Sequence, residues 1–259
     1  MRAYAQEPRL IDGKVAYVPA VAESADTEVV RAATNPFEAQ GGLRLLRGNM
    51  GRSLIKLSAV KPQYRHIEAP AVVVDAPQVL NKLHAAGALP QDFVAVVRYQ
   101  GPRANGMPEL HSLAPLLGLL QNQGRRVALV TDGRLSGASG KIPAAIHVTP
   151  EAARGGPIAR IREGDMIRLD GEAGTLEVLV DAAEWAARSI APNTAPAGND
   201  LGRNLFAVNR RVVGPADQGA ISISCGPARP DGSVWEYDAE YELGHDAAAA
   251  AAPHEAKDA

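Results

Sequence analysis

The sequence gathers many polar groups in one glycine-rich segment, residues 131–141, which we call the central loop. Its sequence is Thr-Asp-Gly-Arg-Leu-Ser-Gly-Ala-Ser-Gly-Lys. Glycine accepts φ > 0 and allows close backbone approach, so we expect Gly133, Gly137 and Gly140 to leave N–H groups facing one small volume. Together with the two serines, the arginine and the lysine of the loop, these groups suit an anionic, oxygen-rich ligand.

Two familiar glycine-rich motifs do not fit the central loop. A phosphate-binding loop of nucleotide-hydrolysing enzymes requires a glycine where Leu135 stands and a serine or threonine where Ile142 stands. A nucleophile elbow requires glycines two residues before and after its serine, but Ser136 has Arg134 and Ala138 there. A glycine turn with a purely structural role is the alternative to a ligand site.

The segments before the central loop read as alternating strands and helices. Short β-branched runs at residues 71–75, 93–97 and 126–130 predict strands buried on both faces, and residues 77–86 predict a helix that connects the first two. This order is typical of parallel strands joined by crossover connections. The central loop then lies at the carboxyl end of a strand, where open α/β sheets bind their ligands.

A second helix is predicted over residues 108–123, just before the strand that leads into the central loop. Pro108 is tolerated in a first turn, and Gly124 is a typical residue after a helix end. On this interpretation Glu109 lies at the positive end of the helix dipole, where a carboxylate stabilises the helix by about 0.3–1 kcal/mol.

The remaining segments predict antiparallel strands and short helices. Residues 41–58 form two alternating stretches around a Gly-Asn-Met-Gly turn, which predicts a hairpin, and we interpret Arg52 and Lys56 on it as a solvated face. Further alternating strands at 158–162, 166–169 and 175–180 are followed by helices at 182–188 and 201–211. The predicted fold is α/β, with a parallel sheet beside an antiparallel, barrel-like sheet and helices covering both.

Two long motifs carry a resemblance to a known family. Residues 100–111, Gln-Gly-Pro-Arg-Ala-Asn-Gly-Met-Pro-Glu-Leu-His, and residues 130–152 resemble the C-terminal domain of the dihydroxyacid dehydratase/phosphogluconate dehydratase family. Residues 103–105 and 138–141 are more similar to the 6-phosphogluconate dehydratase branch than to the dihydroxyacid branch. The resemblance runs from about Pro36 to about Ala187, and more weakly to about residue 224.

The resemblance implies a swivelling β/β/α domain and a division of the chain. Residues 1–38 are interpreted as the remnant of an inter-domain linker, residues 39–190 as the swivelling domain, residues 191–226 as a C-terminal helix and strand extension, and residues 227–259 as a disordered tail. Because the family's long N-terminal domain precedes this segment, we expect the chain to be the C-terminal part of a larger enzyme, either a fragment or the product of a split gene.

The resemblance also implies a reaction and two key residues. The branch dehydrates 6-phospho-D-gluconate to 2-dehydro-3-deoxy-6-phosphogluconate, a hydro-lyase step of the Entner–Doudoroff pathway. Ser136 matches the family's catalytic base, and a serine can act so only where its alkoxide is stabilised by a cation and oriented N–H donors. Glu109 matches a ligand of a divalent metal such as Mg²⁺. The alternatives are a loop-capping hydroxyl for Ser136 and the helix-dipole role for Glu109.

Several further residues are candidates for holding the phosphate and carboxylate of such a substrate. Arginine suits bidentate contacts to these groups and lysine acts as a point charge. The candidates are Arg103, Asn105, Arg134, Ser139 and Lys141. Ordinary solvation of loop side chains is the alternative. We interpret the two histidines at 111 and 147 as structural, and Asp132 as a residue that caps the loop through backbone N–H groups.

Cofactors and partners follow from the same resemblance. The family's [4Fe–4S] cluster takes its cysteine ligands from the N-terminal domain, and the single cysteine of this chain, Cys225, lies outside the matched motifs. We therefore expect the chain alone to be inactive, to need an N-terminal dehydratase domain or chain, and to work in a homodimer.

Composition narrows the class of protein. The 259 residues carry a net charge of −2 with both signs interspersed, which argues against a nucleic-acid partner. The sequence shows neither a membrane-spanning apolar run nor a secretory signal, which predicts a cytoplasmic protein without membrane contact. Two other functions stay open: a dehydratase of a non-phosphorylated sugar acid, and a non-catalytic anion-binding module.

Overall fold

The computed structural model describes residues 6–19, 24–32, 34–37, 41–136, 140–194 and 201–222, which fall into two compact units, residues 1–42 and 43–259. In the first unit, β1 (Gln6–Ile11) pairs antiparallel with β2 (Lys14–Pro19). The turn residues Asp12 and Gly13 both have positive φ, 49° and 72°, as a tight hairpin turn between right-twisted strands requires.

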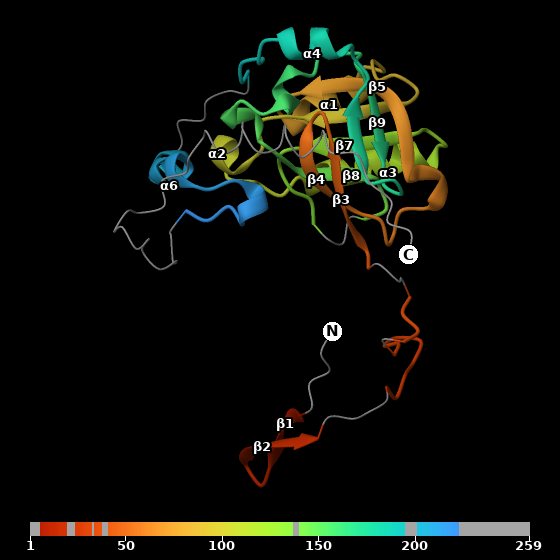
Figure 1. The fold of residues 1–259 in the computed structure, drawn as a ribbon, viewed down its shortest axis with the longest axis vertical. Helices are drawn as coiled ribbons and strands as arrows, with labels where there is room; N and C mark the ends of the chain where they lie inside the picture. The colour runs from red at the N-terminus through yellow and green to blue at the C-terminus, as the bar shows by residue number, and fades with distance from the viewer. Residues whose placement is uncertain are drawn as a thin grey trace, which may run out of the picture. The chain divides into compact units, whose positions relative to one another are not determined.

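The second unit is built on a closed eight-stranded barrel in the order β10-β3-β4-β8-β7-β6-β5-β9 (Figure 1). Neighbours β5 to β8 run parallel, and the other pairs are antiparallel except for a short parallel pairing of β10 with β3. The strands are β3 (Leu43–Gly48), β4 (Gly51–Lys56), β5 (His66–Val74), β6 (Phe93–Val97), β7 (Val127–Thr131), β8 (Ala144–Thr149), β9 (Met166–Asp170) and β10 (Thr175–Val178).

The parallel strands are buried on both faces, as their β-branched sequences predict. One face contributes to a core with members from all eight strands, such as Ile55, Val96 and Ile167, and this core fills the barrel. The other face packs in a second core with residues of the helices, including Leu80 and Leu117. The predicted parallel pairing of β5 and β6 around a connecting helix is confirmed.

The predicted parallel and antiparallel sheets form one closed sheet in the structure. β9 pairs antiparallel with both β5 and β10, and thereby joins the two parts. The predicted strand at 158–162 is wrong, because a 3₁₀ helix, Pro157–Arg160, stands there. Its proline occupies the first turn, and the buried Ile158, Ala159 and Ile161 follow a helical rather than a strand spacing.

The helices agree with the sequence prediction in part. The α-helices are α1 (Pro77–Ala85), α2 (Pro102–Asn105), α3 (Ala114–Asn122), α4 (Ala182–Ala187), α5 (Leu201–Leu205) and α6 (Ala207–Val212). A 3₁₀ turn, His111–Leu113, directly precedes α3. The predicted helix over 108–123 begins too early, so Glu109 lies on no helix. The predicted helix at 201–211 is two helices. Within the described ranges, no helix is long and apolar enough to cross a membrane.

Asn49 completes the seam where the barrel closes. It lies in the turn between β3 and β4, and its side-chain amide donates to the carbonyl oxygen of Val178 at 2.8 Å. The backbone N–H of Val178 donates back to the Asn49 side-chain oxygen at 2.9 Å. One side chain thus reproduces the hydrogen-bond pattern of a neighbouring strand residue, and it joins two positions 129 residues apart.

Candidate active site

Polar residues follow the carboxyl ends of the four parallel strands. Asp75 follows β5, Arg98 and Gln100 follow β6, Asp132 follows β7, and Glu151 lies just beyond β8. All five are buried. We call them the buried network. A parallel sheet brings these ends to one edge, which is where α/β folds place their ligands.

Asp132 ties two loops together from a fully buried position. One carboxylate oxygen accepts from the backbone N–H of Gln100 at 2.8 Å, and the other accepts from that of Ala152 at 2.9 Å. Burial raises the pKa of Asp132 to about 7, although the two backbone hydrogen bonds act to lower it. Asp132 thus accepts backbone N–H bonds as predicted, but the donors belong to the loops after β6 and β8 and not to the central loop.

Glu151 holds the short helix α2 in place. Its carboxylate accepts from the backbone N–H groups of Arg103 and Ala104 at 2.9–3.1 Å. The contact leaves no space for a side chain at Gly101, where an added Cβ would lie 2.3 Å from a Glu151 oxygen. Burial raises the pKa of Glu151, and the bonds to α2 oppose this rise. A buried carboxylate therefore fixes the backbone of the motif at residues 100–111.

A buried ion pair and an amide complete the network. Arg98 Nε donates to Asp75 at 2.8 Å, and both side chains are at least nine-tenths buried. The side-chain amide of Gln100 donates to the carbonyl oxygens of both residues, at 2.9 and 3.1 Å. Its oxygen accepts from Asn105 Nδ2 at 3.0 Å. Hydrogen bonds thus connect the interior with a residue at the surface of the site.

Three residues of the two sequence motifs meet at the surface of this edge, and we call them the exposed triad. Glu109 Oε2 accepts from Arg134 Nη1 at 3.0 Å, and Oε1 accepts from the backbone N–H of Ser136 at 2.7 Å. Arg134 Nε also donates to the carbonyl oxygen of Met107 at 2.8 Å. The Arg134 and Glu109 side chains are 47% and 30% exposed. One carboxylate therefore orders the start of the central loop.

The glycines of the central loop act differently from the prediction. Neither Gly133 nor Gly140 has positive φ, and Gly137 lies outside the described residues. Gly133 is needed for close packing instead, because an added Cβ would lie 2.7 Å from the side chain of Gln100. Its carbonyl oxygen accepts from the N–H of His147 at 2.9 Å, and burial, followed by the charge of Arg134, lowers the pKa of that histidine.

A cavity of about 550 Å³ opens at the ends of β5 and β6. Its polar lining comes from both the buried network and the surface of the site, and includes Asp75, Gln100, Asn105, Glu109, Ser112 and Arg203. Arg203 Nη1 donates to Asn105 Oδ1 at 3.1 Å, so this arginine on α5 belongs to the wall of the cavity. Arg203 was not among the predicted site residues, because it lies about 100 residues from the motif that it contacts.

The other predicted substrate-binding residues are less closely grouped. Arg103 is exposed on α2, and Lys141 is exposed at the end of the central loop, where its backbone carbonyl accepts from Gln121. Ser139 lies outside the described residues. The stem of Lys56 lies beside Gly140, because an added Cβ there would be 3.1 Å from Lys56 Cδ. The substrate-binding roles of these residues remain predictions.

The described residues do not by themselves fit a metal site. In these ranges no group of three or more His, Cys, Asp or Glu side chains could hold a metal ion. Both oxygens of Glu109, the predicted Mg²⁺ ligand, already accept hydrogen bonds from Arg134 and Ser136. Cys225 lies outside the described residues, which hold no other cysteine for a cluster. We therefore derive no step of a reaction from a metal or cluster bound to this chain.

Comparison with known proteins identifies close relatives. The sequence profile described as dihydroxy-acid/6-phosphogluconate dehydratase C-terminal matches residues 28–220. The phosphogluconate dehydratase of Pseudomonas aeruginosa is 52% identical over 224 residues, which cover 86% of this chain and 37% of that protein. The phosphogluconate dehydratase of Escherichia coli K12 is 47% identical over 222 residues, 85% of this chain and 37% of that protein.

A relative with a different name is more distant. The dihydroxy-acid dehydratase of Wolinella succinogenes is 39% identical over 174 residues, which cover 65% of this chain and 31% of that protein. The chain spans little more than a third of the length of the phosphogluconate dehydratases that it matches. The chain therefore matches only part of these proteins, and the description of the matching profile identifies that part as C-terminal.

Proposed function

Because this chain belongs to the dihydroxy-acid/6-phosphogluconate dehydratase family, we propose that it is the C-terminal part of a phosphogluconate dehydratase. The reaction is the dehydration of 6-phospho-D-gluconate to 2-dehydro-3-deoxy-6-phosphogluconate in the Entner–Doudoroff pathway. Identities of 47–52% to proteins of that name support this branch over the dihydroxy-acid branch, at 39%.

The exposed triad is the observation that carries the proposal. Its members come from both sequence motifs, and the Glu109 carboxylate brings the side chain of Arg134 and the backbone of Ser136 together. One of them, Glu109, lines a cavity at the carboxyl ends of parallel strands. This arrangement supports Ser136 as a group that faces a substrate, because the Ser136 residue is exposed and its backbone is held.

In the proposed reaction Ser136 acts as the base. Its alkoxide removes the proton from C2 of the sugar acid, and the C–H electron pair forms the C2=C3 bond as the 3-hydroxyl leaves. The departing hydroxide takes up that proton to form water, which restores the alkoxide. The enol then tautomerises to the 2-keto acid. Arg134 neutralises Glu109, whose charge would otherwise oppose a second negative charge on Ser136. Arg103, Asn105 and Lys141 remain candidates for the substrate's anionic groups.

The complete enzyme needs parts that the described residues lack. We assign the [4Fe–4S] cluster, and most of the ligands of any Mg²⁺, to the N-terminal domain present in the full-length relatives. When bound, these groups supply Lewis-acid chemistry at the departing hydroxyl. The same proposal includes three further features. The barrel-containing part of this chain is the swivelling β/β/α domain, the complete enzyme is a homodimer, and it is located in the cytoplasm.

The test is complementation. The chain is assayed with 6-phosphogluconate and Mg²⁺, alone and after anaerobic mixing with a cluster-loaded N-terminal half of a phosphogluconate dehydratase. We expect turnover only on mixing. Replacement of Ser136 by alanine removes a general base, so turnover falls by about 10²–10⁴-fold. Ser189→Ala, which alters an exposed serine that does not line the cavity, is the matched control and keeps most of the activity.

Four results would contradict the proposal. Robust turnover by the chain alone would place the complete active site on it. Full activity of the Ser136→Ala mixture would remove the assigned base. Equal turnover of gluconate and 6-phosphogluconate would favour a dehydratase of non-phosphorylated sugar acids. If neither sugar acid reacts although the folded chain binds the N-terminal half, a non-catalytic anion-binding module becomes the better description.

A further inference from the structure

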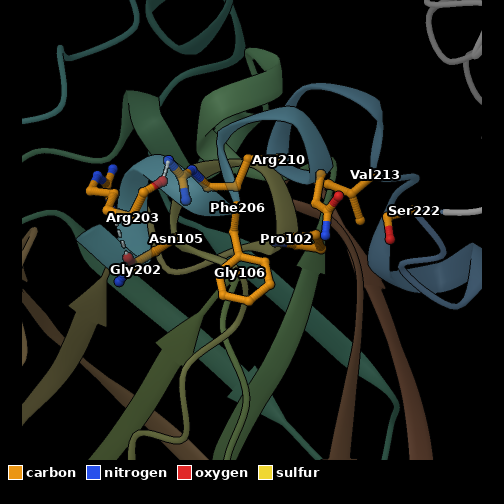
Figure 2. Close-up of a pocket in the computed structure, with 10 residues that line it drawn as sticks. Pro102, Asn105, Gly106, Gly202, Arg203, Phe206, Arg210, Val213 and Ser222 are labelled. Atoms are coloured by element: carbon orange, nitrogen blue, oxygen red, sulfur yellow. Dashed lines mark hydrogen bonds between the residues drawn. The ribbon is translucent and has the colours of Figure 1, made fainter. Parts of the chain in front are cut away.

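A second cavity lies between α2 and the helices α5 and α6. Its volume is about 560 Å³, and its wall includes Asn105, Arg203, Phe206, Asn209, Arg210 and Ser222 (Figure 2). Figure 2 shows the Phe206 ring between Arg203 on one side and Val213 and Ser222 on the other. The sequence motifs contribute only the residues of α2, so neither helix of the far wall entered the predicted site.

The charged side chains in the described lining of this cavity are all positive. Two guanidinium groups, those of Arg203 and Arg210, belong to its lining, and no aspartate or glutamate stands among the described lining residues. Asn105, Asn209 and Ser222 add neutral hydrogen-bonding groups. An arrangement of two arginines with neutral donors and no carboxylate suits a dianion such as a phosphate monoester.

The two arginines are held in place by contacts that leave donors available at Arg210. Arg203 donates to Asn105 Oδ1 at 3.1 Å and to the carbonyl oxygen of Ala104 at 3.4 Å. Arg210 donates from Nη2 to the carbonyl oxygen of Arg203 at 2.6 Å, its one side-chain hydrogen bond within the described ranges. A guanidinium carries five N–H donors, so most of those on Arg210 remain for a ligand.

This cavity adjoins the one beside the exposed triad. Asn105 and Arg203 line both cavities, and their hydrogen bond stands on the boundary between them. Glu109 of the exposed triad also lines the cavity at the ends of β5 and β6. One ligand could therefore reach from the triad to Arg210, with its anionic end beyond the Arg203–Asn105 contact.

We propose that the cavity between α2 and α6 binds the phosphate group of a phosphorylated sugar acid, with Arg210 and Arg203 as its ligands. This inference rests on the proposed function for the rest of the substrate. It makes Arg210 the residue that distinguishes a phosphorylated from a non-phosphorylated substrate, and it moves the phosphate away from Lys141 of the central loop. The acid end of the substrate then lies toward Glu109 and Ser136.

The experiment is calorimetric titration of the full chain with inorganic phosphate, 6-phosphogluconate and gluconate. Arg210→Gln is compared with Arg211→Gln, which removes an exposed arginine of the same helix that does not line the cavity. We expect Arg210→Gln to weaken binding of phosphate and 6-phosphogluconate by about 10- to 100-fold and to leave gluconate unchanged. Arg211→Gln should change none of the three, and circular dichroism confirms that both variants fold.

The outcomes separate this inference from the proposed function. The described walls of the cavity belong to this chain, so failure of the wild-type chain to bind phosphate at millimolar concentration overturns the inference. Equal effects of the two variants, or an equal loss of gluconate binding in Arg210→Gln, overturn it as well. Phosphate binding that depends on Arg210, together with no dehydration after complementation, would retain the phosphate site and reject the dehydratase.

Discussion

The buried network and the exposed triad lie at the same edge of the barrel but differ in what their carboxylates bind. Asp132 accepts from backbone N–H groups of two neighbouring loops, and Glu151 accepts mainly from backbone N–H groups of α2. Glu109 accepts from a partly exposed arginine and from the exposed start of the central loop. The buried carboxylates position the backbone of the site, whereas the exposed carboxylate arranges groups that can meet a ligand.

This difference predicts two separable sets of variants. Changes in the buried network should lower the free energy of unfolding, because they leave charges or donors unsatisfied in the interior. Changes in the exposed triad should lower activity in the complemented enzyme and leave stability nearly unchanged.

Loss of the buried ion pair should have the largest effect on stability. Arg98→Met leaves the buried Asp75 carboxylate without its cation, and breaking such a pair costs about 3–5 kcal/mol. The control is Arg168→Met, whose ion pair with Glu68 is about 40% exposed on both sides and contributes about 0.2–1 kcal/mol. Urea unfolding measures both. Similar losses in the two variants would contradict the distinction between buried and exposed pairs.

The pH dependence of stability should report Asp132. Its pKa is about 7 in the folded chain and near 4 when unfolded, so the folded state binds more protons between these values. The contribution of Asp132 to the free energy of unfolding is therefore complete below pH 4 and decreases as pH rises through 7, by at most about 1.4 kcal/mol per pH unit.

The difference between wild type and Asp132→Asn isolates this contribution. Glu151 shifts in the same direction as Asp132, and the lowered pKa of His147 acts in the opposite direction, but both are present in each protein. We expect the stability advantage of the wild type, measured by urea unfolding, to shrink from pH 5 to pH 8. An advantage that is constant or grows over this range would show that Asp132 is ionised throughout.

The smallest change in stability should come from the exposed triad. Glu109→Gln and Arg134→Gln each remove one side of a partly exposed ion pair, so the free energy of unfolding should change by about 1 kcal/mol or less. Turnover of 6-phosphogluconate after complementation should fall in both variants, because the start of the central loop loses its ordered contact. A large loss of stability in either variant would show that Glu109 and Arg134 support the fold as the buried network does.

The parts of the fold that sequence predicts well are those with local signals. Continuous β-branched runs identified β5, β6 and β7, and a Gly-Asn-Met-Gly turn identified the hairpin of β3 and β4. The prediction for 158–162 failed because a short segment such as Ile-Ala-Arg-Ile-Arg fits a strand or a helical turn equally well, and only its packing decides. Closure into one barrel depends on β9 pairing with β5, about a hundred residues earlier, for which no local signal exists.

The candidate site, like the fold, combines residues that have local sequence signals with residues that are placed only by distant contacts. The first sequence motif indicated Glu109, the second indicated Arg134 and Ser136, and the structure brings the three residues together. Contrary to the prediction, Glu109 does not start a helix but forms a parallel β-bridge with Arg134. Glu151 was missed, yet its place just after a strand, like that of Asp132, is a usable signal. Arg203 gives no such signal, because its role depends on how α5 folds back onto α2.

The seam closed by Asn49 has a consequence for how the chain is made. Its partner, Val178, leaves the ribosome only after 129 further residues have been added. Until then β3 lacks its pairing with β10, and an unpaired strand edge can pair with another chain. Pairings so distant in sequence also form slowly, since a long loop must be ordered first. During synthesis, the interval before Val178 emerges is therefore the period in which the nascent chain is most exposed to aggregation and most dependent on chaperones.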